Sequence, residues 1–121
     1  MLEMIERSMF KNHVLRIVKI DHYADLPNEL KKYYKSIGLG PHLCGYVKVP
    51  ENNPCFGKDY DDIEIECHGG LTYGQHEWDG YWIGFDCAHY DDNIDKCNKE
   101  YVMNECKSII DQLIDLESKN D

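Results

Sequence analysis

The feature that most constrains the fold is an amphipathic stretch from about Asn98 to Leu116. Apolar residues recur there at spacings of three and four positions, and the stripe consists of Val102, Cys106, Ile109, Ile110, Leu113 and Leu116. This spacing predicts a long helix with one apolar face, which has to be buried against another element. The rest of the chain must therefore supply a matching apolar surface.

Four segments are typical of β-strands and provide such a surface. They are rich in β-branched or aromatic residues and cover 14–20, 46–49, 63–68 and 81–87. In the last two segments apolar and polar residues alternate, so one face of each strand is expected to meet the core. A shorter amphipathic helix is predicted over 26–38, where a proline stands near the first turn and a glycine closes the segment.

The predicted order of elements is β-α-β-β-β-α, which favours an α+β fold. We expect a mainly antiparallel sheet of about four strands, with the short helix and the long C-terminal helix packed on it. Residues 1–121 are expected to form a single domain, because the length fits one domain and no linker divides it. Residues 1–12 are expected to form a loose arm or a short helix.

Charge and cysteine usage limit the classes of partner. The net charge is -10 and the pI is about 4.9, whereas a protein that binds long nucleic acid needs a basic stripe. No apolar run approaches the roughly 18 residues of a membrane span, and Glu3 and Glu6 interrupt any signal-peptide stretch. The six cysteines form no Cys-x-x-Cys pair. We therefore expect reduced thiols, no membrane contact and a cytoplasmic location, which is the host cell's if the chain is encoded by a phage.

In two segments a predicted strand ends in polar side chains that can bind a ligand or take part in catalysis. These segments are 66–73 (ECHGGLTY) and 82–89 (WIGFDCAH). Gly69 and Gly70 allow a backbone to approach a ligand closely. Successive N–H groups at this loop can form a nest for a phosphate, with the Thr72 hydroxyl alongside, although no known phosphate-binding motif is matched. If the strands at 63–68 and 81–87 share a sheet, Asp86 and Trp82 project to the same side as His68.

These observations predict a ligand-binding site. Aromatic residues crowd the same half of the chain, and a flat ring such as that of Trp82 can stack on a nucleobase. The predicted ligand-binding residues are Lys58, Tyr60, Asp61, His68, Gly69, Gly70, Thr72, Tyr73, Trp82, Asp86 and His89. A structural alternative stays open, in which His68 caps the turn and Asp86 bonds the amides of the glycine loop.

Metal and nucleophilic chemistry are less favoured. His68, Asp86 and His89 are of metal-ligand types, but neighbours on a strand face opposite ways, which argues against Cys67 and His68 binding one ion. The core positions expected for the cysteines of both strands argue against a Cys/His nucleophile pair. Residues 91–95 resemble a calcium loop in composition but lack the remaining ligands of an EF-hand. We therefore expect no metal and no cofactor, and we assign no catalytic residue.

The ordered motifs resemble a family of small proteins encoded by phages, prophages and bacteria. The similarity rests on residues 45–50, 57–62, 68–73 and 82–89, together with the start of the closing helix, and covers roughly residues 43–113. Relatives often show His-Ala-Gly-Asp after the cysteine, where this chain has His-Tyr-Asp-Asp at 89–92. The resemblance implies a phage context and no particular activity.

A phage context favours interaction with the host cell. We expect a small-molecule binding protein that sequesters a nucleotide-like signal, of cyclic-nucleotide or ADP-ribose type, in a counter-defence role. The loop 68–73 would hold a phosphate, Trp82 or Tyr73 would stack on a base, and Asp86 and His89 would bind polar edges.

Two other functions stay open. The first is a small hydrolase that uses His68 as general base oriented by Asp86, with or without a metal. The second is an acidic inhibitor that binds a basic protein. A homo-oligomer that completes the pocket across a dimer is compatible with each of these functions.

Overall fold

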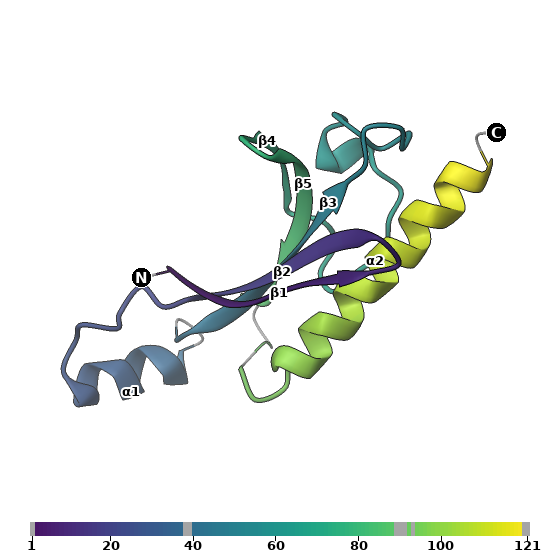
Figure 1. Ribbon diagram of the computed structural model, residues 1–121. Coiled ribbons are helices and arrows are strands. Elements are labelled where there is room, and N and C mark those ends of the chain that lie inside the picture. The colour runs from purple at the N-terminus through teal and green to yellow at the C-terminus, as the bar shows by residue number, and fades with distance from the viewer. Residues whose placement is uncertain (1, 38–39, 89–91, 93, 120–121) are drawn as a thin grey trace.

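The architecture is a twisted antiparallel sheet with one long helix across it. The computed structural model describes residues 2–37, 40–88, 92 and 94–119 (Figure 1). Its elements, in chain order, are β1 (Leu2–Phe10), β2 (His13–Ile20), α1 (Asn28–Ser36), β3 (His42–Val49), a 3₁₀ turn (Tyr60–Asp62), β4 (Tyr73–Glu77), β5 (Gly80–Asp86) and α2 (Lys99–Lys119). The five strands lie in the order β1-β2-β3-β5-β4, and every neighbouring pair is antiparallel. The α+β class, the antiparallel sheet, the short helix and the long C-terminal helix are thus confirmed.

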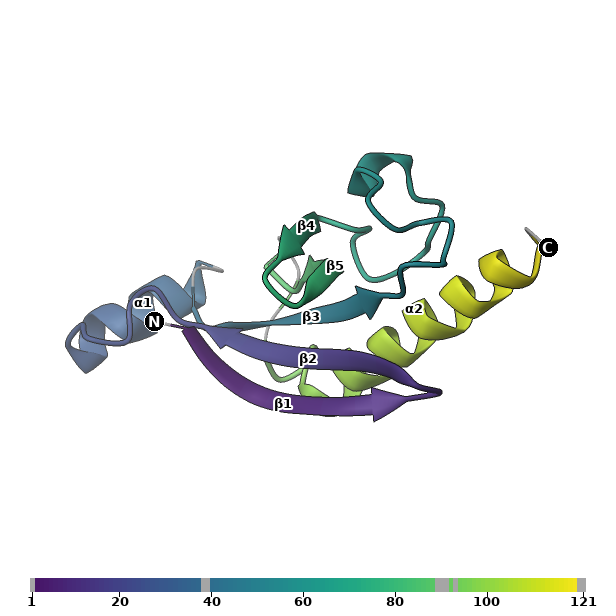
Figure 2. The ribbon, with the colours of Figure 1, turned by 45° about the horizontal axis from the view of Figure 1, so that its top comes forward.

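Helix α2 covers one face of the sheet and buries the apolar stripe that its sequence predicts (Figures 1 and 2). Asn98 caps the helix, because its side-chain oxygen accepts a 2.9 Å hydrogen bond from the backbone N–H of Tyr101. The backbone of β3 approaches the helix closely at Gly45, where a Cβ would stand 2.7 Å from the Cys106 sulfur. The fully buried residues between helix and sheet include Leu15, Ile17, Val47, Ile83, Val102, Cys106, Ile109, Ile110 and Leu113.

The opposite face of the sheet has no helix laid across it within the described residues. Helix α1, which was expected to pack on the sheet, buries no residue and lies beyond one end of the sheet in both views (Figures 1 and 2). The alternation along β5 places Tyr81, Ile83 and Phe85 in the core cluster, so Trp82 and Asp86 point to the open face. The sequence-based assignment of these two faces of β5 is therefore correct.

The N-terminal residues form an edge strand, so the prediction of a loose arm or short helix is wrong. Strand β1 pairs with β2 along its length, and the turn that joins them consists of Lys11 and Asn12, with φ angles of 49° and 64°. Two successive residues at positive φ are the requirement of the tightest hairpin turn, which usually recruits Asn-Gly. The Lys-Asn pair and the absence of a clean alternation concealed this hairpin in the sequence.

The segment 63–68 is extended but does not belong to the sheet, so the third predicted strand is wrong. Its alternation is real, since Ile63 and Ile65 are buried while Glu64 and Glu66 are exposed. Its backbone, however, bonds to α2. The side chain of Gln112 accepts from the N–H of Glu66 at 2.8 Å and donates to its carbonyl at 2.7 Å. These side-chain bonds satisfy the backbone groups that strand pairing would otherwise satisfy. The alternation of buried and exposed residues alone therefore resembled a strand.

Strand β4 lies between 63–68 and 81–87, where the sequence predicted no strand. Strand β4 forms the second edge of the sheet and joins β5 through a two-residue turn at Trp78 and Asp79. The sheet therefore has five strands, one more than the sequence suggested. Glycines at both ends and a polar composition hid β4, because an edge strand needs little apolar sequence. No helix among the described residues is long and apolar enough to cross a membrane.

We expect the Leu113→Ala substitution to lower the free energy of unfolding by about 2–5 kcal/mol, because it empties a fully buried site between α2 and the sheet. The matched control is Leu30→Ala on α1, where the side chain is 45% exposed and the expected change is within about 0.5 kcal/mol. Urea unfolding followed by far-UV circular dichroism measures both values. Similar losses in the two variants would contradict this assignment of the core.

Candidate functional site

The predicted ligand-binding residues lie in three separate places. Lys58, Tyr60 and Asp61 belong to the long connection between β3 and β4. His68 and the two glycines form a turn beside the N-terminal part of α2. Thr72, Tyr73, Trp82 and Asp86 lie on β4, on β5 or next to them, towards the open face. His89 falls outside the described residues.

A pocket of about 230 Å³ opens on the helix-free face of the sheet. The register that pairs Tyr46 and Tyr73 with Gly84 brings the two tyrosine rings together at 5.0 Å, edge to face. A side chain at Gly84 would overlap the Tyr46 ring, so glycine is what allows this ring to lie across the sheet. The lining residues are Ile20, His42, Cys44, Tyr46, Thr72, Tyr73, Phe85, Asp86 and Ala88. Three of the predicted residues, Thr72, Tyr73 and Asp86, are thus brought to one pocket.

A carboxylate stands at the rim of this pocket. Asp86 accepts a 3.1 Å hydrogen bond from the Thr72 hydroxyl and another 3.1 Å bond from the backbone N–H of Ala88. The backbone N–H of Thr72 in turn donates to the Gly84 carbonyl at 2.9 Å. Burial lowers the pKa of His42, which favours a neutral imidazole. The described lining residues include no lysine or arginine, so the formal charge of the described pocket lining is that of the Asp86 carboxylate.

Trp82 cannot stack on a ligand in this structure, which corrects the role that the sequence suggested. Its side chain is 0% exposed, because the Arg16 guanidinium lies 4.2 Å above the ring centroid. The same guanidinium is 4.8 Å from the ring of Tyr46. The indole N–H donates to Asp79 at 2.9 Å. Tyr73 and Tyr46 are therefore the rings that face the pocket.

Arg16 also organises the wall of the pocket. Its two terminal nitrogens donate to the two carboxylate oxygens of Glu77, at 2.9 and 2.6 Å. The Tyr73 hydroxyl donates to the same carboxylate at 2.7 Å. The hydrogen bond from Arg16 lowers the pKa of Glu77, and burial raises the pKa of Tyr73. This network holds Tyr73 against Tyr46.

The glycine loop at Gly69 and Gly70 forms a turn, and one of its backbone N–H groups already donates a hydrogen bond within the turn. Gly69 and Gly70 have φ angles of 68° and 80°, a region that side chains disfavour. The N–H of Gly70 donates to the Cys67 carbonyl at 2.9 Å. The Gly70 N–H, one of the backbone groups expected to bind a phosphate, is therefore part of the turn itself.

Lys58 is separated from these residues. It lines a different pocket, of about 280 Å³, together with Asp62, Ile63 and Leu116. Its backbone carbonyl accepts a hydrogen bond from the Tyr81 hydroxyl, and the neighbouring Tyr60 packs beside Gly74. Lys58, Tyr60 and Asp61 thus do not contribute to the pocket that contains Asp86, contrary to the single site that was expected.

His68 lies beside α2 with partners that the sequence did not suggest. Its Nδ1 is 2.8 Å from the Tyr101 hydroxyl, and its Nε2 is 2.8 Å from a carboxylate oxygen of Asp92. The Cys97 sulfur is 3.7 Å from the same Nε2. The carboxylate that faces His68 is therefore that of Asp92, whereas Asp86 is directed to Thr72 and Ala88. The sequence placed His68 on the side of Asp86 only if 63–68 were a strand of the same sheet, and this condition fails because 63–68 packs on the helix.

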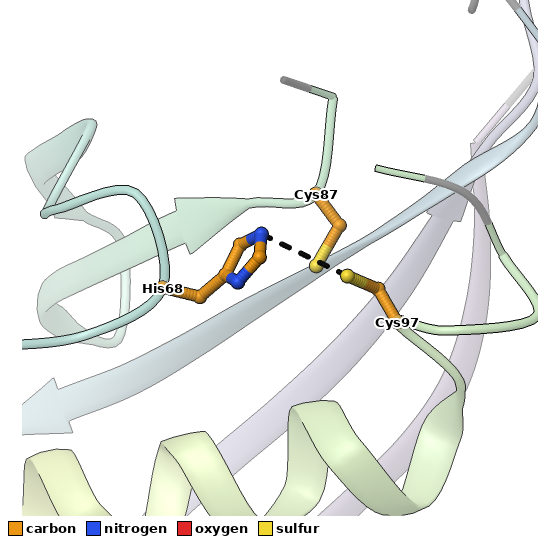
Figure 3. A group of neighbouring side chains, drawn as sticks. All are labelled: His68, Cys87 and Cys97. Atoms are coloured by element: carbon orange, nitrogen blue, oxygen red, sulfur yellow. Dashed lines mark hydrogen bonds between the residues drawn. The ribbon is translucent and has the colours of Figure 1, made fainter. Parts of the chain in front are cut away.

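This arrangement does not form a nucleophilic triad. Asp92 and Cys97 both approach Nε2, whereas a triad places the acid and the nucleophile on different ring nitrogens. Burial also raises the pKa of the Cys97 thiol and that of Cys87, which disfavours a thiolate nucleophile. The ligand atoms of His68, Cys87 and Cys97 do converge within 4.8 Å of one another (Figure 3). Sequence spacing alone gave no signal for this group, since Cys97 is far from both partners along the chain.

We expect the Glu77→Gln substitution to weaken the dependence of stability on acid pH. The pKa of Glu77 is lowered by Arg16, so the ion pair stabilises the fold above the ordinary pKa of a glutamate. This stabilisation is lost as the pH falls through the lowered pKa. Urea unfolding near pH 7 and near pH 3.5 should show a larger loss for the native chain than for the variant. Glu64→Gln, at an exposed position, is the control, and an unchanged pH dependence in Glu77→Gln would contradict the ion pair.

Comparison with known proteins identifies no relative. No protein-family model, no curated protein and no solved structure matches this chain. The resemblance of its motifs to small phage and bacterial proteins therefore stays a prediction from the sequence. Function has to be argued from the geometry of the pocket on the open face and of the group around His68.

Proposed function

We propose that this protein binds a small molecule through a planar, N–H-bearing group, in the manner of a nucleobase. The observation that carries the proposal is the pocket of about 230 Å³ that places the Asp86 carboxylate beside the paired rings of Tyr46 and Tyr73. A ring system supplies apolar faces for the tyrosines, and its amino or imino groups supply donors for the carboxylate. These are the two contacts by which proteins read an unpaired base.

The charge of the pocket decides which part of a nucleotide enters it. The described lining contains a carboxylate and no cationic side chain, so a phosphate inside the pocket would be repelled. Arg16 is close, but its guanidinium is engaged by Glu77 and covers Trp82. A nucleotide-like ligand would therefore insert its base and leave its phosphates towards the solvent. This reverses the sequence-based expectation, in which the glycine loop held the phosphate.

The proposed role is sequestration of such a ligand without its conversion. The resemblance to phage proteins supports a counter-defence context, and the pocket supports recognition of a base. Sequestration requires that the ligand is recovered with its mass unchanged after the protein is denatured. Recovery of a cleaved product would contradict sequestration and favour the hydrolase alternative.

We expect the native chain to bind cyclic dinucleotides or ADP-ribose in isothermal titration calorimetry and native mass spectrometry, and Asp86→Asn to bind at least about 10-fold more weakly. The substitution keeps the shape but turns one acceptor into a donor, and a hydrogen bond to a charged group contributes about 1.5–3 kcal/mol. Asp115→Asn, at an exposed position on α2, removes the same charge and should bind as the native chain does.

Two outcomes would contradict the proposal. The first is equal weakening in Asp86→Asn and Asp115→Asn, which would assign the effect to net charge. The second is the absence of binding to every nucleotide and to the corresponding free nucleosides. The thermal melting temperature of Asp86→Asn should be measured beside the binding, so that a loss of affinity is not confused with a loss of fold.

A further inference from the structure

Three side chains from distant parts of the chain converge on one point beside the start of α2. His68 comes from the glycine turn, Cys87 follows β5 directly, and Cys97 lies two residues before α2 (Figure 3). We propose that they bind a structural Zn²⁺ ion, with the Asp92 carboxylate at the fourth position. The site lies next to the pocket on the open face, since Cys87 follows Asp86 directly, but the proposal does not rest on the proposed function.

The distance between the Cys97 sulfur and the His68 ring agrees with a tetrahedral zinc site. Typical Zn–S and Zn–N bonds of about 2.3 and 2.0–2.1 Å place a sulfur and a nitrogen ligand about 3.6 Å apart. The Cys97 sulfur and the His68 Nε2 are 3.7 Å apart, and the three ligand atoms all lie within 4.8 Å of one another. A weak contact between a thiol and an imidazole needs only these two groups, whereas a metal site needs several ligand atoms that converge on one point, as the Cys87 sulfur does here.

The histidine is held in the orientation that a metal ligand needs. The Tyr101 hydroxyl is 2.8 Å from Nδ1, so the other ring nitrogen faces the sulfurs. The backbone N–H of His68 donates to the Glu105 carboxylate at 2.8 Å, which fixes the turn against α2. A partner on the second ring nitrogen is the usual support of a metal-bound imidazole, because it sets the tautomer and the ring plane.

Asp92 is not one of the three converging ligands but lies beside them, so it is the candidate for the fourth position. One of its carboxylate oxygens is 2.8 Å from the His68 Nε2 and 3.8 Å from the Cys97 sulfur. A tetrahedral site would place nitrogen and oxygen ligands about 3.4 Å apart, so a small outward shift of the carboxylate admits the ion. On binding, each thiol releases its proton to the solvent and the thiolate sulfur bonds to the metal.

The surroundings indicate zinc in a structural role. Cys87 and Cys97 are only 2% and 3% exposed, which suits a closed site and not a catalytic one with an open position. Two thiolates and an imidazole favour zinc over the harder calcium or magnesium ions. A cavity of about 30 Å³ is lined by Cys87, Asp92 and His42, so it borders two of the four proposed ligands.

The test is the metal content of the full-length chain purified under reducing conditions and loaded with Zn²⁺. We expect about one zinc ion per chain in native mass spectrometry and elemental analysis, and its loss in Cys87→Ser and Cys97→Ser. Cys55→Ser is the matched control, because Cys55 is a buried free cysteine outside the group and should leave the metal content unchanged. Co²⁺ in place of zinc should give the absorption band of thiolate-to-metal charge transfer in the native chain, weakened in each of the two serine variants.

A milder pair of variants keeps the test decisive if the serine variants do not fold. Tyr101→Phe should bind Zn²⁺ about 10–100-fold more weakly in competition with a chelator, since it removes the support of the His68 ring. Tyr33→Phe, exposed on α1, should bind as the native chain does. Three results would overturn the proposal: a native chain that retains no zinc and shows no cobalt–thiolate band, equal metal content in Cys97→Ser and Cys55→Ser, or a Cys87–Cys97 disulfide in the reduced preparation.

Discussion

The packing of α2 on the sheet is the interaction on which the rest of the structure depends. Its apolar stripe closes the core, and the absence of a side chain at Gly45 lets the helix approach β3 closely. Polar side chains of α2 then bond the backbone of the segment 63–68, which does not pair with the sheet. Gln112 bonds the backbone of Glu66, and Glu105 bonds that of His68. The helix therefore supplies both the hydrophobic burial and the backbone partners of a segment that would otherwise be unpaired.

The alternation of a strand explains why two sites lie back to back at the end of β5. Successive side chains point to opposite faces, so Asp86 joins Thr72 at the open-face pocket while Cys87 turns towards His68 and Cys97. A metal held by Cys87 would fix the backbone from which Asp86 and the Ala88 amide project. The two proposed sites thus adjoin through the peptide bond between Asp86 and Cys87, and each can be tested without the other.

The elements that the sequence predicted are those whose periodicity is enforced by the core. A regular buried face is shared by the long helix and by the strands at 14–20, 46–49 and 81–87. The apolar spacing in the sequence therefore predicted these elements. The edge strands β1 and β4 were missed because pairing on one side places few demands on side chains. The segment 63–68, in contrast, has a clear alternation but is not a strand. Its burial against a helix imposes the same alternation as burial in a sheet. No local pattern distinguishes these two environments.

That misassignment explains the wrong place predicted for His68. With 63–68 in the sheet, His68 would share a face with Asp86; with 63–68 on α2, His68 meets Asp92 and Cys97, which no short motif connects. Trp82 was correctly placed on the open face, but its burial depends on Arg16 from β2, a contact set by strand order and not by sequence spacing. The cation that covers Trp82 also closes the bidentate pair with Glu77 and positions Tyr73. Arg16 thus orients one wall of the pocket from the next strand but one. Residue types alone place Thr72, Tyr73 and Asp86 together, but they do not show this contact.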